Sequence, residues 1–440
     1  MPLRYSVITF GCRVNQADSL GFEEELRAAG AVAVSPDTAD LVVVNTCSVT
    51  ASADQGARQT IRRIARDNPG ARIVVTGCYA TRRPDELTAL PNVARVVLND
   101  DKSTLISLAG VRRVRLSLGG PSDKQPDFED ADISTADRFS DGDGACGAAI
   151  EPGMAGRTAY TLRVQTGCGE PCSYCIIPTT RGLPRSVRVE EVLGEAERVA
   201  AAGFKEIALT GVHLGSYGRD LARPSSLTEL LRRLRDQRSD VLFRISSLEP
   251  MDCSREIVEL VADAERFAPH FHLPLQHAAD HLLTAMRRPY TIAQYASLVD
   301  AIRTRMPHAS IGSDIIIGFP GETDRDVEQL ATYLECSPLT HLHVFPYSDR
   351  PGTLASTMRD KVPGGLIRER GRRIREIGQR LTERFRDSQI GTTHRALTLE
   401  DGSLAVTGNY LKVRIPPGRA RNEWVRLRVT SHHEGELLPG

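Results

Sequence analysis

The chain has 440 residues, which suggests about three domains. Hydrophobic residues make up 40% of it and charged residues 25%, as in an ordinary soluble globular protein. Lys+Arg and Asp+Glu both number 56, which argues against a uniformly basic nucleic-acid coat protein but leaves room for a local basic patch. No apolar run reaches the roughly 18–20 residues that span a bilayer, and Met1–Phe10 lacks the features of a signal peptide, so we expect a cytoplasmic protein without a membrane segment.

Residues 1–120 alternate between strand and helix signals. Helical spacing of apolar residues appears in Ser19–Ala29 and Gln55–Ala65, and short β-rich runs lie at Tyr5–Thr9, Leu41–Val44 and Ile73–Thr76. This βαβ pattern is typical of an open parallel sheet. We therefore predict an N-terminal α/β domain over residues 1–120.

An acidic segment separates this domain from the middle of the chain. Between Pro121 and Pro152 there are nine acidic and two basic residues, a net charge of −7, with several Gly and Ser and few large apolar side chains. Such a composition is typical of a linker, which we place at 121–155.

The middle of the chain, 156–387, repeats the strand–helix pattern. Helical stretches such as Val189–Ala202 and Ile292–Arg305 separate β-rich runs at Thr161–Gln165, Glu206–Leu209, Leu242–Ile245, Phe271–Leu275, Ile311–Ile317 and His341–Phe345. Six strands with helical crossovers predict a full or partial (β/α) barrel. One amphipathic helix, Leu366–Arg386, then ends the domain. Its arginines either form a solvent-exposed face or contact the phosphates of a nucleic acid.

The last segment, 388–440, alternates apolar and polar residues and predicts a small antiparallel β domain. Lys361–Gly440 holds sixteen basic and nine acidic residues, so positive charge is concentrated at this end. We expect the alternating positions to put several cations on one face, where they can contact RNA phosphates. Tyr410 and Trp424 either stack on unpaired bases or, for Trp424, fill the small core. The candidate RNA-binding residues are Lys412, Arg414, Arg426 and Arg428.

Nine cysteines are an odd number and too few for a disulfide scaffold of this size, so metal ligands or catalytic groups are expected. Cys168-Gly-Glu-Pro-Cys172-Ser-Tyr-Cys175 places three thiols within eight residues, just after a predicted strand. A closed zinc site normally has four ligands, commonly from two separated pairs. Three cysteines on an iron–sulfur cluster would instead leave one iron open to another ligand. The alternative is a chance cluster of loop cysteines.

The spacing Cys-x3-Cys-x2-Cys, with an aromatic residue before the last cysteine, resembles the radical S-adenosylmethionine superfamily. The resemblance implies a [4Fe-4S] cluster on these cysteines whose open iron binds S-adenosylmethionine, and reductive cleavage to a 5′-deoxyadenosyl radical. It also implies cofactor contacts from Gly211, Ser246 and Gly318, which follow three of the predicted barrel strands. For Gly211 and Ser246 the alternatives are a plain turn glycine and a serine that caps the next turn.

Three further cysteines recur at one point of the N-terminal pattern. Cys12, Cys47 and Cys78 each follow a predicted strand by one to three residues and lie 35 and 31 residues apart, close to one βαβ step. Parallel strands end at a common edge, so these thiols can converge on a shared cluster. The alternative for each is a buried core cysteine. The cysteines outside any cluster spacing, which we expect not to be ligands, are Cys146, Cys253 and Cys336.

The stretches around the three N-terminal cysteines, Thr9–Gln16, Asn45–Thr50 and Thr76–Ala80, resemble methylthiotransferases of the radical S-adenosylmethionine superfamily. The resemblance covers nearly the whole chain, apart from the acidic linker, and Gly408–Val413 is similar to a stretch of the small β-barrel called TRAM. It implies a second [4Fe-4S] cluster on Cys12, Cys47 and Cys78, whose open iron carries the sulfur to be transferred. The implied fold is α/β: an open parallel sheet domain, a partial barrel and a small antiparallel β-barrel.

Gly77–Ala80, Leu209–Gly218 and His343–Ser348 look most like the branch of this family that modifies threonylcarbamoyladenosine. That branch implies transfer of a methylthio group to carbon 2 of this nucleoside, next to the anticodon of tRNA, with a reductase or flavodoxin-type electron donor. The runner-up is a sibling that acts on isopentenyladenosine in tRNA or on a ribosomal protein. A rival of another class is a non-enzymatic iron–sulfur regulator that binds RNA, although such a protein does not need a barrel with a ligand-lined mouth.

His270, His272 and His277 surround one predicted strand of the barrel. The sequence shows no carboxylate paired with them at metal-ligand spacing. We therefore expect packing or surface positions for these histidines rather than a metal site.

Overall fold

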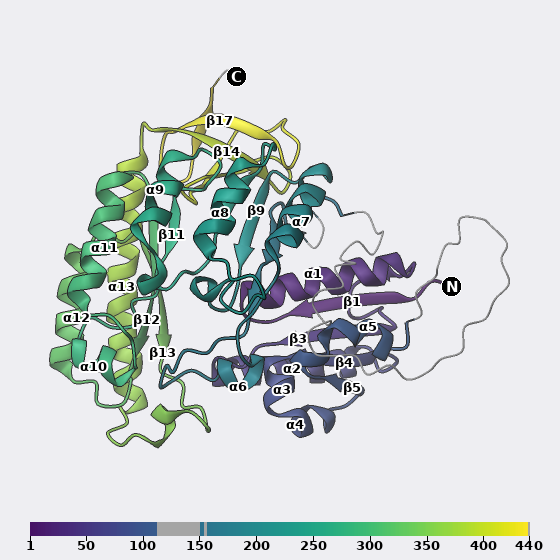
Figure 1. The fold of residues 1–440 in the computed structure, drawn as a ribbon. Helices are drawn as coiled ribbons and strands as arrows, with labels where there is room; N and C mark the ends of the chain where they lie inside the picture. Colours follow the sequence, from purple (N-terminus) through teal and green to yellow (C-terminus); the bar gives the residue numbers. More distant parts are fainter. Residues whose placement is uncertain (112–149, 154–155, 439–440) are drawn as a thin grey trace. The chain divides into compact units, whose positions relative to one another are not determined.

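The computed structural model describes residues 1–111, 150–153 and 156–438, and its contacts divide the chain into two compact units, Met1–Ala149 and Ile150–Gly440. Figure 1 shows the elements of each unit. The predicted acidic linker, 121–155, lies almost wholly outside the described residues. Within the described ranges, no helix is both long and apolar enough to cross a membrane.

A five-stranded parallel sheet with the order β2-β1-β3-β4-β5 forms the centre of the N-terminal unit, as predicted. The central strand β3 is buried throughout: Val42 and Val44 join the hydrophobic cluster on one face, and Leu41 and Val43 join the cluster on the other. Apolar side chains therefore cover both faces, as parallel sheets require. The elements are β1 (Arg4–Thr9), α1 (Arg13–Ala28), β2 (Val32–Ala33), β3 (Leu41–Thr46), α2 (Ala51–Asp67), β4 (Arg72–Gly77), α3 (Cys78–Arg82), α4 (Pro84–Thr88), β5 (Val93–Val97) and α5 (Leu105–Leu108).

Two three-stranded parallel sheets, β10-β9-β6 and β11-β12-β13, form the predicted partial barrel in the second unit. Isolated bridges from Phe243 to Phe267 and from Ser247 to His272 join the two sheets into one wall. The strands are β6 (Tyr160–Arg163), β9 (Glu206–Thr210), β10 (Leu242–Ile245), β11 (His270–His272), β12 (Ser310–Ile317) and β13 (His341–Pro346). The other elements are β7 (Gln165–Thr166), α6 (Ile177–Arg181), β8 (Arg185–Ser186), α7 (Val189–Ala201), α8 (Leu227–Asp236), α9 (Arg255–Asp263), α10 (Asp280–Ala285), α11 (Ile292–Arg305), α12 (Asp324–Cys336) and α13 (Gly364–Gln389).

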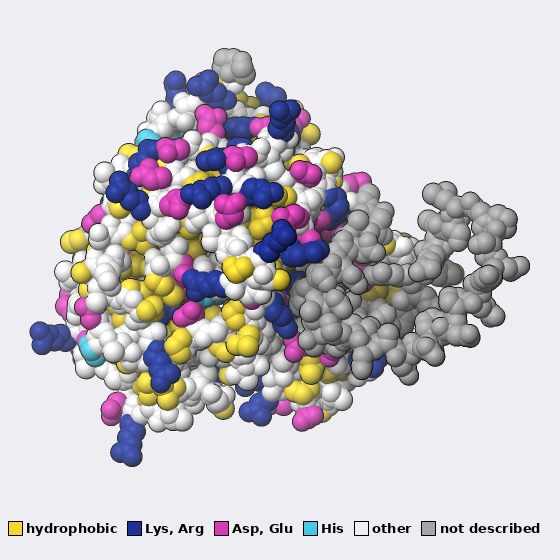
Figure 2. All heavy atoms as spheres, viewed as in Figure 1, with side chains coloured by type: hydrophobic (Ala, Val, Ile, Leu, Met, Phe, Trp, Pro, Cys, Tyr) yellow, Lys and Arg dark blue, Asp and Glu magenta, His cyan; other side chains and the backbone are white. Residues whose placement is uncertain are grey.

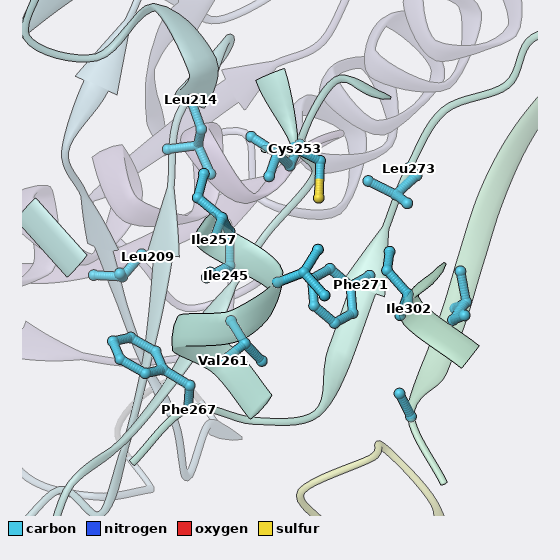
Figure 3. Close-up of a cluster of buried hydrophobic side chains, with 14 of the residues drawn as sticks. Leu209, Leu214, Ile245, Cys253, Ile257, Val261, Phe267, Phe271, Leu273 and Ile302 are labelled. Atoms are coloured by element: carbon cyan, nitrogen blue, oxygen red, sulfur yellow. The ribbon is translucent and has the colours of Figure 1, made fainter. Parts of the chain in front are cut away.

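Helices cover the outer face of this wall and bury its apolar side chains. Val261 of α9 packs with Leu209 of β9 and Ile245 of β10 in one large hydrophobic cluster (Figure 3). Ile374 and Ile377 of the predicted amphipathic helix, now α13, belong to the same cluster. Burying each such side chain contributes about 1.5–3 kcal/mol. Because successive strand residues alternate, the inner face of the wall is left to other side chains, described below.

The predicted small β-barrel is an antiparallel sheet in the order β16-β15-β14-β17-β18, with an isolated bridge from Arg414 to Glu434 between its two edges. Val413, Val425 and Leu427 fill its core together with Phe385 from α13. The strands are β14 (Thr393–Leu399), β15 (Leu404–Thr407), β16 (Lys412–Arg414), β17 (Trp424–Val429) and β18 (Gly435–Leu437).

A fully buried ion pair joins this C-terminal domain to the barrel. Arg244 of β10 donates from Nε to Glu206 Oε1 at 2.8 Å and from Nη1 to the carbonyl oxygen of Gly408 at 2.8 Å. The guanidinium carbon lies 4.6 Å from the ring centroid of Tyr410. The inner face of the barrel therefore carries a charge whose partners come partly from the C-terminal domain.

We expect Arg244→Met to destabilise the second unit by about 3–5 kcal/mol, because Glu206 would stay buried without its cation. Arg395→Met is the matched control: its partner Asp240 is exposed, so the loss should be below about 1 kcal/mol. Urea unfolding of both variants gives the two free energies. Equal losses would contradict a structural role for the buried pair.

Candidate metal centres and barrel interior

Cys168, Cys172 and Cys175 lie in the loop between β7 and α6, near the C-terminal end of β6. Two backbone amides point at sulfur atoms: Glu170 N–H at Cys168 Sγ, 3.4 Å away, and Ile177 N–H at Cys175 Sγ, 3.5 Å away. Hydrogen bonds of this kind favour thiolates over thiols. The donor set therefore suits a metal cluster held on one face by three cysteines.

Burial works against ionisation of these thiols in the absence of a metal. It raises the pKa of Cys172, an effect that Arg288 partly offsets, and raises the pKa of Cys175 to about 12. A bound iron ion would supply the positive charge that removes these protons, since coordinating thiols are deprotonated. Cys172 and Cys175 thus lie in an environment that disfavours their thiolates until a metal binds.

Two cations that the sequence did not point to flank the cysteine loop. Arg288 Nη1 donates to Cys172 Sγ at 3.2 Å, and the same guanidinium pairs with Glu249. Burial opposes a charge on His213, but its hydrogen bond to Asp252 and the nearby Cys168 sulfur raise its pKa to about 10. Both groups are therefore positive at neutral pH and stabilise negative charge on the sulfur atoms.

The three predicted cofactor contacts differ in what surrounds them. Ser246 directly follows β10, and its buried hydroxyl has no hydrogen-bond partner among the described residues, so it is free to meet a ligand. At Gly211 an added Cβ would lie 2.8 Å from Leu214 Cδ2, and at Gly318 one would lie 2.4 Å from Ile367 Cγ1. Gly318 also has φ +83°, which favours glycine. Packing thus accounts for both glycines, and their contact with a cofactor stays a prediction.

In the N-terminal unit the structure brings the three cysteine-bearing strand ends to one edge. Thr9 of β1 pairs with Asn45 of β3, which pairs in turn with Thr76 of β4, and the cysteines follow two or three residues later. Cys12 caps the N-terminus of α1, where the helix dipole favours negative charge. Cys12 is exposed, whereas Cys47 and Cys78 are buried.

A glycine and a buried polar network hold this edge together. A Cβ on Gly11 would lie 2.6 Å from Cys47 Sγ, so the loop carrying Cys12 can approach Cys47 only because residue 11 has no side chain. Lys102 Nζ donates to Asp18 at 2.6 Å and to Asn45 at 3.2 Å. These bonds tie helix α1 to the end of strand β3, next to the loops that carry Cys12 and Cys47.

The remaining cysteines have other surroundings. Cys253 is buried in the barrel core (Figure 3), where burial raises its pKa to about 12. Cys336 is exposed at the end of α12. Cys146 lies outside the described residues.

The structure brings a carboxylate to His272 that the sequence spacing did not reveal, while the expectation of packing or surface positions for the three histidines stays a prediction. His272 Nε2 lies 2.9 Å from Asp314 Oδ1, and His343 Nδ1 lies 3.2 Å from the same oxygen. Asp314 comes from β12, forty-two residues farther along the chain, so only the strand pairing shows the contact. His277 is buried, 3.7 Å from Glu322, and its burial lowers its pKa to about 4.

The candidate RNA-binding residues lie on the outside of the C-terminal domain, where Figure 2 shows Lys and Arg side chains gathered among a few acidic ones. Lys412, Arg414, Arg426 and Arg428 are all exposed, and they alternate with buried Val413 and Leu427. Trp424 is half-buried beneath the Arg395 guanidinium, 3.9 Å from the ring centroid, and does not fill the small core. Tyr410 contacts Arg244 and His270 with its ring.

Two family descriptions match this chain. Residues 4–99 match the "Uncharacterized protein family UPF0004", and residues 162–334 match the "Radical SAM superfamily". The first match holds Cys12, Cys47 and Cys78, and the second holds the Cys168 loop and the barrel strands up to β12.

Relatives match over nearly the full length. The chain is 36% identical to the threonylcarbamoyladenosine tRNA methylthiotransferase MtaB of Aquifex aeolicus, over 96% of this chain and 98% of that protein. It is 34% identical to the MtaB of Bacillus subtilis, over 86% and 80%. It is also 30% identical to the tRNA-2-methylthio-N(6)-dimethylallyladenosine synthase of Corynebacterium efficiens, over 99% and 82%.

Among solved structures, the fold is similar to the radical S-adenosylmethionine methyltransferase TsrM from Kitasatospora setae, determined with cobalamin and a [4Fe-4S] cluster bound. The TM-score is 0.53, with 16% sequence identity, over 81% of this chain and 74% of that one. At this identity the likeness concerns the fold alone.

We expect Cys172→Ala and Cys47→Ala each to lower the iron bound after anaerobic reconstitution by about half, because each removes one thiolate from a three-ligand site. Cys172→Ala should also abolish cleavage of S-adenosylmethionine, whereas Cys47→Ala should leave uncoupled 5′-deoxyadenosine formation. Cys336→Ala, at an exposed cysteine, is the control and should retain all its iron. Near wild-type iron in either of the first two variants would contradict the two-cluster assignment.

Proposed function

Because the chain belongs to the radical S-adenosylmethionine methylthiotransferase family, we propose that it adds a methylthio group to carbon 2 of N6-threonylcarbamoyladenosine next to the anticodon of tRNA. The observation that carries this proposal is its 36% identity, over 98% of the relative, to an enzyme named for this reaction. A cysteine triad in each of the two matched segments supports it.

Enzymes of this family use S-adenosylmethionine and a [4Fe-4S] cluster, and the loop with Cys168, Cys172 and Cys175 fits such a cluster. Cys12, Cys47 and Cys78 would hold a second one. When bound, these groups would supply a 5′-deoxyadenosyl radical that removes hydrogen from carbon 2 and the sulfur that takes its place, and a second S-adenosylmethionine would supply the methyl group on that sulfur. A reductase or flavodoxin-type protein would supply the electrons, and the tRNA substrate makes the cytoplasm the expected compartment.

The residues around the Cys168 loop have separate tasks in this proposal. Arg288 and His213 hold positive charge beside the thiolates, which eases reduction of an anionic centre. Ser246 offers an unpartnered hydroxyl to the cofactor on the inner face of the barrel. No side chain is needed as a general base, because a radical rather than a proton acceptor removes the hydrogen.

The proposal predicts that the reconstituted protein, with dithionite and S-adenosylmethionine, converts threonylcarbamoyladenosine in tRNA to its 2-methylthio derivative. Mass spectrometry of the digested nucleosides measures the product. Unmodified transcript is the control and should give none. If only isopentenyladenosine were modified, the activity of the related isopentenyladenosine enzymes would be favoured. If no 5′-deoxyadenosine formed, the protein would not be a radical S-adenosylmethionine enzyme.

Positive charge on the C-terminal domain should supply most of the tRNA affinity. Deleting that domain would uncover buried Arg244, so side-chain changes are the sharper test. Changing Lys412, Arg414, Arg426 and Arg428 to Gln should weaken tRNA binding. The slope of the logarithm of the binding constant against the logarithm of the salt concentration should also become less steep, by roughly 0.7–0.9 for each phosphate that is no longer neutralised.

The matched control changes four exposed arginines of the barrel helices, Arg232, Arg235, Arg255 and Arg305, to Gln. Filter binding over a salt series gives both slopes. If the two quadruple variants had the same tRNA affinity and the same salt dependence of binding, the C-terminal cations would have no special role in tRNA binding.

A further inference from the structure

The inner face of β11, β12 and β13 carries polar residues. In a closed barrel, branched apolar residues fill the corresponding positions. The pairing places His272 beside Gly312, Gly312 beside His341, and Asp314 beside His343. In-register residues of parallel strands face the same side. The outward residues of β13 pack against the helices, so these polar side chains face the interior.

Asp314 joins two of the imidazoles. Its Oδ1 lies 2.9 Å from His272 Nε2 and 3.2 Å from His343 Nδ1. The ring of His341 lies 6.1 Å from that of His272 and 5.6 Å from that of His343. A Cβ on Gly312 would lie 2.0 Å from His341 Nε2, so this ring rests directly on the backbone of β12.

The charges on this cluster are of both signs. Burial disfavours ionised Asp314, but hydrogen bonds from His272 and His343 hold its pKa well below the usual range. The same hydrogen bond raises the pKa of His343. Burial lowers the pKa of His341 to about 4, so that ring is neutral at neutral pH. The cluster therefore offers a carboxylate, an imidazole whose protonated form that carboxylate stabilises, and a neutral imidazole side by side.

A ligand can reach this cluster because β13 is an edge strand. The side chain of His343 is 57% exposed and that of Asp314 is 26% exposed, although both face inward. Asp314 lies three residues before Ile317, the end of β12, which is about 10 Å along the strand. The cluster thus lies on the inner face of the sheet, about 10 Å below the C-terminal end of β12.

We propose that His272, Asp314 and His343 recognise the polar substituent on N6 of the substrate adenine, with imidazole N–H groups donating to its carboxylate and Asp314 accepting from its hydroxyl or amide groups. This inference rests on the proposed function, in which the substituent is a threonylcarbamoyl group. An apolar dimethylallyl group could form no hydrogen bond with the ring nitrogens and the carboxylate oxygen that these three residues do not use for one another. Sites built to hydrogen-bond a substrate group reject analogues that lack it.

The decisive measurement compares anticodon stem-loop RNAs that carry the free carboxylate or its methyl ester. The reconstituted wild-type protein should prefer the acid in kcat/KM by about ten- to a hundredfold, the value of a hydrogen bond to a charged group. His343→Gln keeps a polar side chain without the positive charge and should bring this ratio close to one. His432→Gln is the control, since it removes an exposed histidine from a similar pair with Asp387, and its ratio should equal that of wild type.

Asp314→Asn should lose the preference for threonylcarbamoyladenosine over the glycine analogue, which lacks the hydroxyl, while it keeps a side chain of the same shape. An unchanged acid-to-ester ratio in His343→Gln would overturn the inference. Failure of the wild type to modify either RNA would instead count against the proposed function itself.

The three ligand atoms lie within 4.8 Å of one another, which also suits a divalent cation. Elemental analysis of wild type and His343→Gln separates the two possibilities. One equivalent of a metal other than iron in the wild type, absent from the variant, would overturn recognition by hydrogen bonds. The expected result is iron only, in equal amounts in both proteins.

Discussion

Parallel strand pairing decides where chemistry can gather in both units of this chain. In a parallel sheet every strand ends at the same edge, so residues that lie about thirty positions apart in sequence become neighbours. The register Thr9–Asn45–Thr76 aligns the loops that carry Cys12, Cys47 and Cys78. In the barrel the same pairing aligns the ends of β6, β9 and β10, where the Cys168 loop, His213 and Ser246 follow.

The polar interior of the barrel imposes a second constraint, because each buried charge there needs a partner. Arg244 of β10 and Glu206, the first residue of β9, neutralise each other, and the Gly408 carbonyl accepts a further hydrogen bond from Arg244. Asn409 also donates to the carbonyl oxygen of His308 at 2.8 Å. The C-terminal domain is thus fixed to the barrel by groups that the barrel must satisfy in any case.

The sequence predicted those features whose cause is local. The Cys168 loop was predicted because three ligands lie within eight residues, and helix Leu366–Arg386 because its apolar stripe recurs along one segment. Helix α1 begins at Arg13, earlier than the predicted Ser19, and its first turns bury the polar Asn15 and Asp18 beside a single apolar residue, Val14. Asn15 donates to the carbonyl oxygen of Thr46, a contact that no apolar periodicity reveals.

The features that the sequence did not predict are mostly polar contacts between residues far apart in the chain. Arg288 reaches Cys172 across 116 positions, and Asp314 meets His272 across 42. Neither pair has a characteristic spacing, because loop lengths between strands vary while the pairing itself is constant. Trp424 likewise alternates with core residues but lies on the opposite face of β17, under Arg395. For such residues the strand register, rather than composition or periodicity, is the quantity that determines their partners.

The two cations beside the cysteine loop stabilise negative charge both when the cysteines ionise and when a cluster bound to them is reduced. A thiolate trio on a [4Fe-4S] centre is negatively charged, and adding an electron increases that charge. Arg288 beside Cys172 and protonated His213 beside Cys168 lower the free energy of each charged state, and partial burial strengthens both interactions. The stabilisation grows with the negative charge, so it is largest for the reduced state. In the proposed enzyme, the residues that help these cysteines ionise would thus also favour reduction of the cluster that they hold.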